Sequence, residues 1–209
     1  MKKNKLSLLC CLIGTLILLS LTACSSDDGS ENDKPEETLI PISVKGAEIK
    51  VGETTVQTLL DQGLEVTWMD ENYEKIPIDP DEQLDADSYY TGGSLWLSDH
   101  VFAHISLATE ETPVPMSEAV IARLEFHIAT EEDETVLNQM AFDGVPVTEL
   151  TCEKAQEMYP DWSGNEVMWL KYGLEYSYSL NFDMSTGRLT QFTVERKYDV
   201  DWNGTGQTN

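Results

Sequence analysis

The sequence predicts an α+β protein built from two similar units, each a short helix packed on an antiparallel sheet. Two observations support this prediction. The spacing of apolar residues changes from a helical period to strict alternation after each of two short helices. The order of hairpin, short helix and strands also occurs twice along the chain.

The N-terminus has the pattern of an export signal. Three lysines lie among the first five residues, and an apolar run, Leu6–Leu21, follows them. The run is short for a membrane-spanning helix, which needs about 20 apolar residues. It ends in Leu21-Thr22-Ala23-Cys24, which resembles the lipobox of bacterial lipoproteins. The resemblance implies cleavage before Cys24, diacylglycerylation of its thiol, and a lipid-anchored protein on the outer side of the cell membrane.

The remaining chain divides by composition. Residues 1–23 are the predicted signal peptide, and residues 24–38 are an acidic tether without large apolar side chains. The first predicted unit is 39–135, the second is 136–202, and a polar tail, 203–209, follows.

Charge excludes several classes of partner. The formal net charge is −25, and loss of the signal removes three lysines and no acid. Such a chain lacks the Lys and Arg clusters that bind nucleic acid, and anionic lipid repels it. Membrane attachment must therefore come from the lipid on Cys24, whose two acyl chains suffice for stable anchoring.

The elements of the first unit begin with a hairpin, Ile42–Val51, that turns at Gly46. Thr54 is the predicted N-cap of the following helix, with Gln57 completing a capping box, and Gly63 ends the helix. Two apolar strand rows follow: Val101, Ala103, Ile105 and Leu107, then Ala122, Leu124, Phe126 and Ile128.

The second unit repeats this order. A hairpin, Phe142–Val147, precedes a helix that Thr151 caps and Pro160 ends. The segment 174–183 then alternates apolar and polar residues, as a half-buried strand does, and returns through a turn at Gly187. Phe192 and Val194 of the returning strand are predicted to face the core.

This order of elements resembles tandem helix-on-sheet modules of bacterial exported proteins, such as the beta-lactamase-inhibitor-protein-like and small outer-membrane-lipoprotein folds. Most of those families bind, inhibit or assemble with other proteins. The resemblance therefore implies a binding module.

No catalytic motif supports an enzyme. The sequence lacks GxSxG, P-loop, GxGxxG and HExxH patterns. Cys152 opens a predicted helix, but all three histidines lie in the other unit, so we predict a small buried residue without catalytic function.

The histidines allow one metal-site hypothesis. Alternation places His100, His104 and His127 on the solvent face of their strands. If Leu107 pairs with Val120, then His100 lies opposite His127, and Glu125 lies between them. Two imidazoles and a carboxylate suit zinc or copper, although three exposed histidines without a ligand are the simpler interpretation.

Two further candidates are an acidic loop and an aromatic residue. Asp79, Asp81, Asp85 and Asp87 lie close together in sequence and could hold calcium, or they form a solvated loop without the EF-hand pattern. Trp162, in a loop after Pro160, is the aromatic residue predicted to contact a ligand.

The sequence therefore predicts a lipid-anchored surface protein with a non-catalytic module that binds a protein or glycan and needs no cofactor. The first alternative is a lipoprotein that binds calcium or zinc. The second is a surface hydrolase that uses a carboxylate pair, for which the spacing of the acids selects no candidate.

Overall fold

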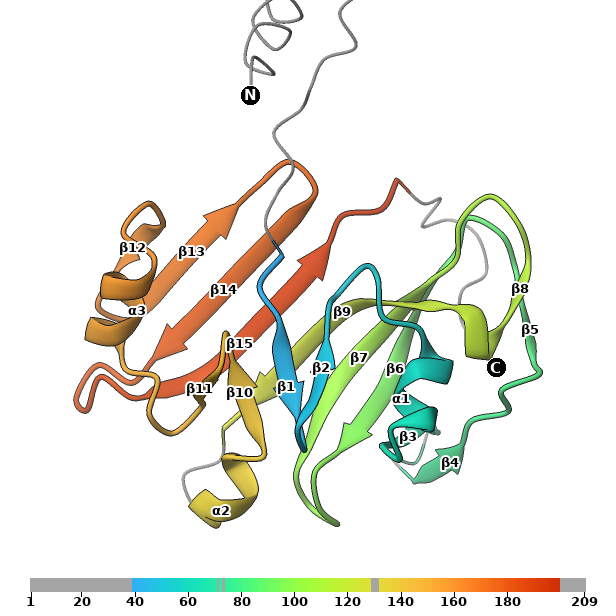
Figure 1. Ribbon diagram of the computed structural model, residues 1–209, viewed down its shortest axis with the longest axis horizontal. Helices are drawn as coiled ribbons and strands as arrows, with labels where there is room; N and C mark the ends of the chain where they lie inside the picture. Colours follow the sequence, from blue (N-terminus) through green and yellow to red (C-terminus); the bar gives the residue numbers. More distant parts are fainter. Residues whose placement is uncertain (1–38, 71, 73, 129–131, 200–209) are drawn as a thin grey trace, which may run out of the picture. The chain divides into compact units, whose positions relative to one another are not determined.

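Most of the described chain forms one large antiparallel sheet. The computed structural model describes residues 39–70, 72, 74–128 and 132–199 (Figure 1). The large sheet has nine strands, which lie side by side in the order β12 (Ser163–Asn165), β13 (Met168–Tyr172), β14 (Tyr176–Phe182), β15 (Leu189–Arg196), β9 (Val120–His127), β7 (Phe102–Ala108), β6 (Tyr89–Trp96), β3 (Glu65–Met69) and β4 (Lys75–Pro77).

Two smaller sheets and four short helical segments complete the fold. The second sheet has four strands in the order β11 (Val145–Pro146), β10 (Met140–Phe142), β1 (Ile42–Val44) and β2 (Ala47–Ile49). A two-stranded sheet pairs β5 (Gln83–Leu84) with β8 (Val114–Pro115). The helical segments are α1 (Val56–Asp61), η1 (Met116–Glu118), α2 (Glu134–Leu137) and α3 (Cys152–Met158). Among the described residues, none of the helices is long and apolar enough to span a membrane.

The core lies between the two larger sheets. Phe142 of β10 packs on Phe192 of β15 with ring centroids 5.4 Å apart, and Phe192 lies 6.0 Å from Phe126 of β9. All three rings are fully buried. Helix α1 packs beside β3 and helix α3 packs beside β13. Both helices lie in the same layer as the four-stranded sheet, on one face of the large sheet (Figure 1). The fold is thus α+β, with antiparallel sheet predominating.

The two halves of the chain share their sheets. Strand β9 pairs with β15, and β1 pairs with β10. The sequence predicts a separate sheet in each unit, whereas the structure has strands of both halves in each of the two larger sheets. The physical reason is that separate sheets would leave the edges of β9 and β15 unpaired, and pairing satisfies their backbone groups. All described residues belong to one compact unit, 37–209, and the predicted boundary at residue 136 stays a prediction.

Of the two helix N-caps predicted from the sequence, one is confirmed and the other is wrong by one residue. Thr151 caps α3 as predicted, because its side chain accepts a hydrogen bond from the backbone N–H of Lys154. The predicted cap of α1, Thr54, is wrong: Thr55 accepts the hydrogen bond from the N–H of Thr58. The hydroxyl of Thr54 instead accepts from the N–H of Lys50 in the preceding turn. Two adjacent threonines offer the same capping chemistry, and only the path of the chain selects one of them.

The alternating strand of the second half is confirmed, except at its first residue. Tyr176, Tyr178, Leu180 and Phe182 of β14 are buried. Leu174 is 71% exposed, because the chain is still in the turn before β14 begins. Gly187 has a φ of 65°, in the left-handed region that the predicted turn requires. The apolar alternation therefore identified the core side of this strand but not its start.

Several predictions concern residues outside the described part of the chain. Four predicted features lie outside the described residues: the signal 1–23, the lipobox with Cys24, the tether 24–38 and the tail 203–209.

Candidate functional site

The nine-stranded sheet has a face turned away from α1, α3 and the four-stranded sheet, and we call it the open face. Helix α2 borders this face, since Leu137 lines a cavity together with His104 and His127. One row of directly paired residues crosses this face from edge to edge. Its members are Ser163, Leu170, Ser179, Thr193, Glu125, His104, Ser94, Thr67 and Pro77. The row is mostly hydroxyl side chains, with one charged and one imidazole group near its middle. A flat surface of this kind is suited to contact with another molecule.

An aromatic stack lies beside this row on the open face. The rings of Trp96 and Phe102 are 4.5 Å apart, and Phe102 meets His104 edge-on at 4.9 Å. Lys75 of β4 lies over the Trp96 ring, with its Nζ 3.4 Å from the ring centroid. Trp96 Nε1 donates a hydrogen bond of 2.8 Å to Thr67 Oγ1. Strand pairing holds the stack in place, because Trp96 lies opposite Phe102 on the neighbouring strand.

His104 continues the stack into a cluster of charged groups. Its ring centroid lies 6.1 Å from that of His127. His127 Nε2 and Glu125 Oε1 are 2.6 Å apart, and Arg123 Nη2 donates to the other carboxylate oxygen of Glu125. The Glu125 side chain is only 16% exposed, so these contacts compensate a carboxylate that is largely removed from water.

The pKa of His104 is lowered from 6.5, and the largest cause is desolvation by the side chains around it. Glu125 opposes this shift, whereas the positive fields of His127 and Arg123 reinforce it. The imidazole of His104 is consequently neutral at pH 7, with a lone pair available for a ligand.

A cavity of about 230 Å³ adjoins the cluster. Its lining is His100, Val101, Phe102, His104, His127, Glu132 and Leu137. The chain has three histidines, and all of them line this one cavity. The histidines come from the turn before β7, from β7 itself and from the end of β9.

The predicted partners of the histidines are wrong because the strand register is shifted. Leu107 pairs with Ile121 and not with Val120, and an irregularity follows between Ser106 and Leu107. His104 consequently lies opposite Glu125, whereas His100 precedes β7 and pairs with no strand residue in the described chain. The side-chain alternation was right, but it could not supply the register, since a shift by two residues keeps every side chain on its face.

His104 is absent from the metal ligands that the sequence predicts, and Arg123 and Trp96 are not among the predicted site residues. His104 had a signal, namely its alternation with Ala103 and Ile105, but its partner depends on the register. As the side chains stand, no three His, Cys, Asp or Glu groups of the described residues are placed to hold a metal ion. Metal binding at His100, His127 and Glu125 therefore stays a prediction.

The acidic loop forms turns between described strands. Asp79 Oδ1 accepts a hydrogen bond from the N–H of Asp81, and the N–H of Asp85 donates to the hydroxyl of Tyr90. Asp87 has a φ of 49°, a left-handed conformation that aspartate tolerates in turns. These four aspartates do not converge on one point in the described chain, and calcium binding there also stays a prediction.

Trp162 is not an exposed contact residue. It is 9% exposed and stacks on Tyr159 with centroids 4.4 Å apart, while Tyr178 lies at 5.5 Å and Phe142 at 6.4 Å. The loop after Pro160 folds back onto the core, which the local sequence could not reveal. Exposed aromatic surface is found instead at Tyr172 of β13, which is 75% exposed.

Cys152 is a buried core residue, as predicted. Its Sγ lies 3.4 Å from Gln156 Nε2. Desolvation raises the pKa of its thiol, and the negative charge of Glu166 raises it further. A thiol with a raised pKa is a poor nucleophile at neutral pH, since the thiolate is the reactive form.

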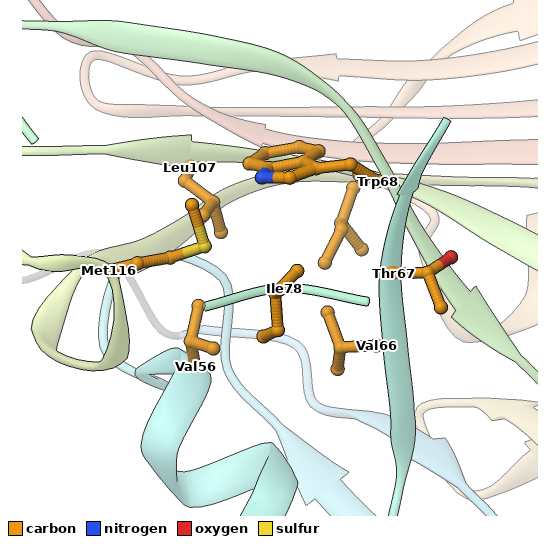
Figure 2. A pocket seen from close by; sticks show the side chains of 9 residues that line it. Val56, Val66, Thr67, Trp68, Ile78, Leu107 and Met116 are labelled. Carbon is orange, nitrogen blue, oxygen red and sulfur yellow. The ribbon is translucent and has the colours of Figure 1, made fainter. Parts of the chain in front are cut away.

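An apolar pocket lies on the covered side of the large sheet. Figure 2 shows Trp68 lying across it, with Val56 of α1 and Met116 of η1 together on one side. Val66 lies on the facing side, and Thr67 points away from the pocket. The pocket has no room for a water molecule. We interpret it as a packing defect of the core, because an apolar gap too small for water stays empty.

Comparisons with known proteins do not assign this site: no family model, curated protein or solved structure matches the chain.

Proposed function

We propose that this chain is an exported surface protein, anchored in the cell membrane by a lipid on Cys24, whose open face binds a protein partner without catalysis. The lipobox pattern before Cys24 supports the export and the anchor. The observation that carries the binding function is the row of paired residues that crosses the open face.

The composition of the open face favours binding. Its central strands present small polar side chains, Ser177 and Ser179 on β14 and Thr193 on β15, which are half-buried and leave the surface flat. Aromatic side chains flank this area, with the exposed Tyr172 on one side and the half-buried Phe102, which packs on the buried Trp96, on the other. Interfaces are enriched in aromatic anchors of this kind, because a rigid ring buries much area at little entropic cost.

Charge pairing on the open face also favours a protein partner. Although the chain carries a net charge of −25, acids on this face have basic neighbours: Glu65 lies 3.3 Å from Lys75, and Glu125 contacts both Arg123 and His127. Burying a paired carboxylate costs less than burying an isolated one. The acidic surroundings would steer a partner with a basic rim toward the face.

Photocrosslinking in cells tests the binding function. The full chain carries a photoreactive residue at Ser179 or at Thr193 on the open face, and at Glu48 of β2 as the control position on the other sheet. We expect both open-face positions to give the same discrete protein adduct and the control to give none. Equal adducts at all three positions, or adducts with glycan alone, would contradict the proposed protein partner.

The anchor is tested separately. We expect Cys24→Ala to remove the lipid-dependent mass and to leave the chain uncleaved before residue 24, whereas Cys152→Ala keeps both modification and cleavage. Metabolic labelling with a fatty acid measures the difference. Equal labelling of wild type and Cys24→Ala would reject the proposed anchor.

We also propose that the chain consists of two related units. The strand order of the large sheet supports this. Strands β12, β13, β14 and β15 follow one another in chain order from one edge toward the middle of the sheet, where β15 pairs with β9. Strands β3, β6, β7 and β9 follow in chain order toward the same pair from the other side. In the four-stranded sheet, β11-β10 likewise mirrors β2-β1, and each hairpin is followed by a helix with a threonine cap. A tandem arrangement of this kind doubles the width of the open face.

A further inference from the structure

The histidine-lined cavity has the composition of a transition-metal site. Its polar lining consists of His100, His104, His127 and Glu132, which lie in two segments, 100–104 and 127–132, that the pairing of β7 with β9 brings together. Imidazole nitrogen is a common ligand of zinc, copper and nickel, whereas calcium and magnesium prefer oxygen ligands.

The spacing of two of these rings suits a single ion. Metal–nitrogen bonds of about 2.0–2.1 Å place the centroids of two imidazoles on one ion about 5–6.5 Å apart. The centroids of His104 and His127 are 6.1 Å apart, and the rings lie nearly perpendicular, at 85°. The two residues are on adjacent strands, β7 and β9, whose pairing keeps this separation.

Glu125 orients one of the two rings. Its Oε1 lies 2.6 Å from His127 Nε2, so a proton on Nε2 leaves the lone pair of Nδ1 for a ligand. Carboxylates that hold a metal-binding histidine in this way are a general feature of such sites. Arg123 holds Glu125 in turn, which fixes the carboxylate against the strand.

We propose that His104 and His127, with His100 as a third ligand, bind one divalent transition-metal ion of the zinc and copper class in this cavity. His100 lies in the exposed turn between β6 and β7 and lines the same cavity. Its side chain is not placed as a third ligand in the structure, so the proposal requires it to rotate toward the ion. Water occupies the fourth position, or the carboxylate of Glu132 does. The site differs from the sequence-based hypothesis, in which Glu125 was itself a ligand, and it does not depend on the proposed binding of a protein.

Equilibrium dialysis of the full chain in detergent tests this site. The chain is first freed of metal with a chelator and then titrated with zinc, with calcium as the comparison ion. We expect one zinc ion per chain above the background of a very acidic protein. Loss of either imidazole, in His104→Ala or His127→Ala, should weaken zinc binding at least about tenfold, and His100→Ala should also weaken it. Glu125→Gln should weaken it about 10- to 100-fold, as loss of an orienting carboxylate does.

The control variant is Asp79→Asn in the acidic loop, which removes one carboxylate away from the cavity and should leave zinc binding unchanged. A second measurement needs no variant: nitrogen NMR signals of the His104 and His127 rings should shift together as one equivalent of zinc is added to the wild-type chain. Unchanged ring signals would overturn the proposal. Zinc binding that survives both alanine substitutions but falls in Asp79→Asn would also overturn it, because the acidic surface would then hold the ion.

Discussion

Two neighbouring rows of residues cross the same strands of the large sheet, one on each face. The row on the covered face is Trp169, Leu180, Phe192, Phe126, Ala103, Leu95 and Val66. The row on the open face is Leu170, Ser179, Thr193, Glu125, His104, Ser94 and Thr67. Each residue of one row is the chain neighbour of a residue in the other, yet the first row is almost wholly apolar and the second mostly polar.

This difference separates stability from function. Most covered-row side chains pack into the core against the four-stranded sheet and the helices, so their free energy of burial holds both halves together. The open row is mostly polar and only partly accessible. Ser94 and Thr67 are buried, whereas Ser179 and Thr193 are half-buried and His104 is exposed, so the accessible part of the row is the part that can serve a ligand. Substitutions on the two rows should differ in size and in what they affect.

Phe192→Ala should produce the largest effect. Phe192 packs on Phe126 of its own sheet and Phe142 of the other, so its loss leaves a cavity between the two sheets. We expect the free energy of unfolding to fall by about 3–5 kcal/mol, measured by denaturant titration. Its neighbour on the open face, Thr193→Ala, is the control and should change it by no more than about 0.5 kcal/mol. Equal losses would remove the distinction between the faces.

Gly93→Ala should have the next largest effect. A Cβ at this position would lie 2.7 Å from Ile105 Cγ1 and 2.8 Å from Trp68 Cζ3, so the indole over the apolar pocket must move (Figure 2). We expect a loss of about 1–3 kcal/mol in unfolding free energy, together with a change in tryptophan fluorescence. Ser179→Ala on the open face is the control. A stable Gly93→Ala variant would show that the empty space beside Trp68 absorbs the methyl group.

Thr151→Ala should have a smaller effect on the covered layer. Thr151 caps α3, and without its hydroxyl the N–H of Lys154 loses its partner. The expected loss is about 1 kcal/mol in thermal or denaturant unfolding. Thr151→Ser keeps the hydroxyl and should keep most of the stability. If serine and alanine are equally destabilising, then packing of the threonine methyl, and not the cap, is what matters.

The smallest expected effect is the pH dependence contributed by His104 on the open face. Its pKa is lowered from 6.5 in the folded chain, so the unfolded chain binds the proton more readily. The resulting stability is present above pH 6.5 and is lost as the pH falls through the folded pKa. Denaturant titrations at pH values from 7.5 to 5 cover about one unit or more on either side of the ordinary histidine pKa. Over this range the free energy of unfolding should decline less for His104→Gln than for wild type. A steeper decline in the variant would mean that His104 is stabilised as the cation.

Local patterns predicted much of the secondary structure. Alternation identified the core side of β7, β9, β14 and β15, and the capping preference of Thr151 and the turn at Gly187 were both confirmed. These features depend on contacts within a few residues or on one face of one strand. The errors at Thr54 and Leu174 are shifts of one or two residues at the ends of elements, where local signals are weakest.

By itself, the sequence determined which side chains of β7, β9, β14 and β15 lie toward the core, because the pleat alternates with period two whatever the neighbouring strand is. Only the tertiary structure decided that β9 pairs with β15, that His104 lies opposite Glu125, and that Trp162 is buried on Tyr159. Those outcomes depend on register and on the pairing of distant strands. A register shift of two residues preserves every local pattern, so only the packing of the whole chain distinguishes one register from another.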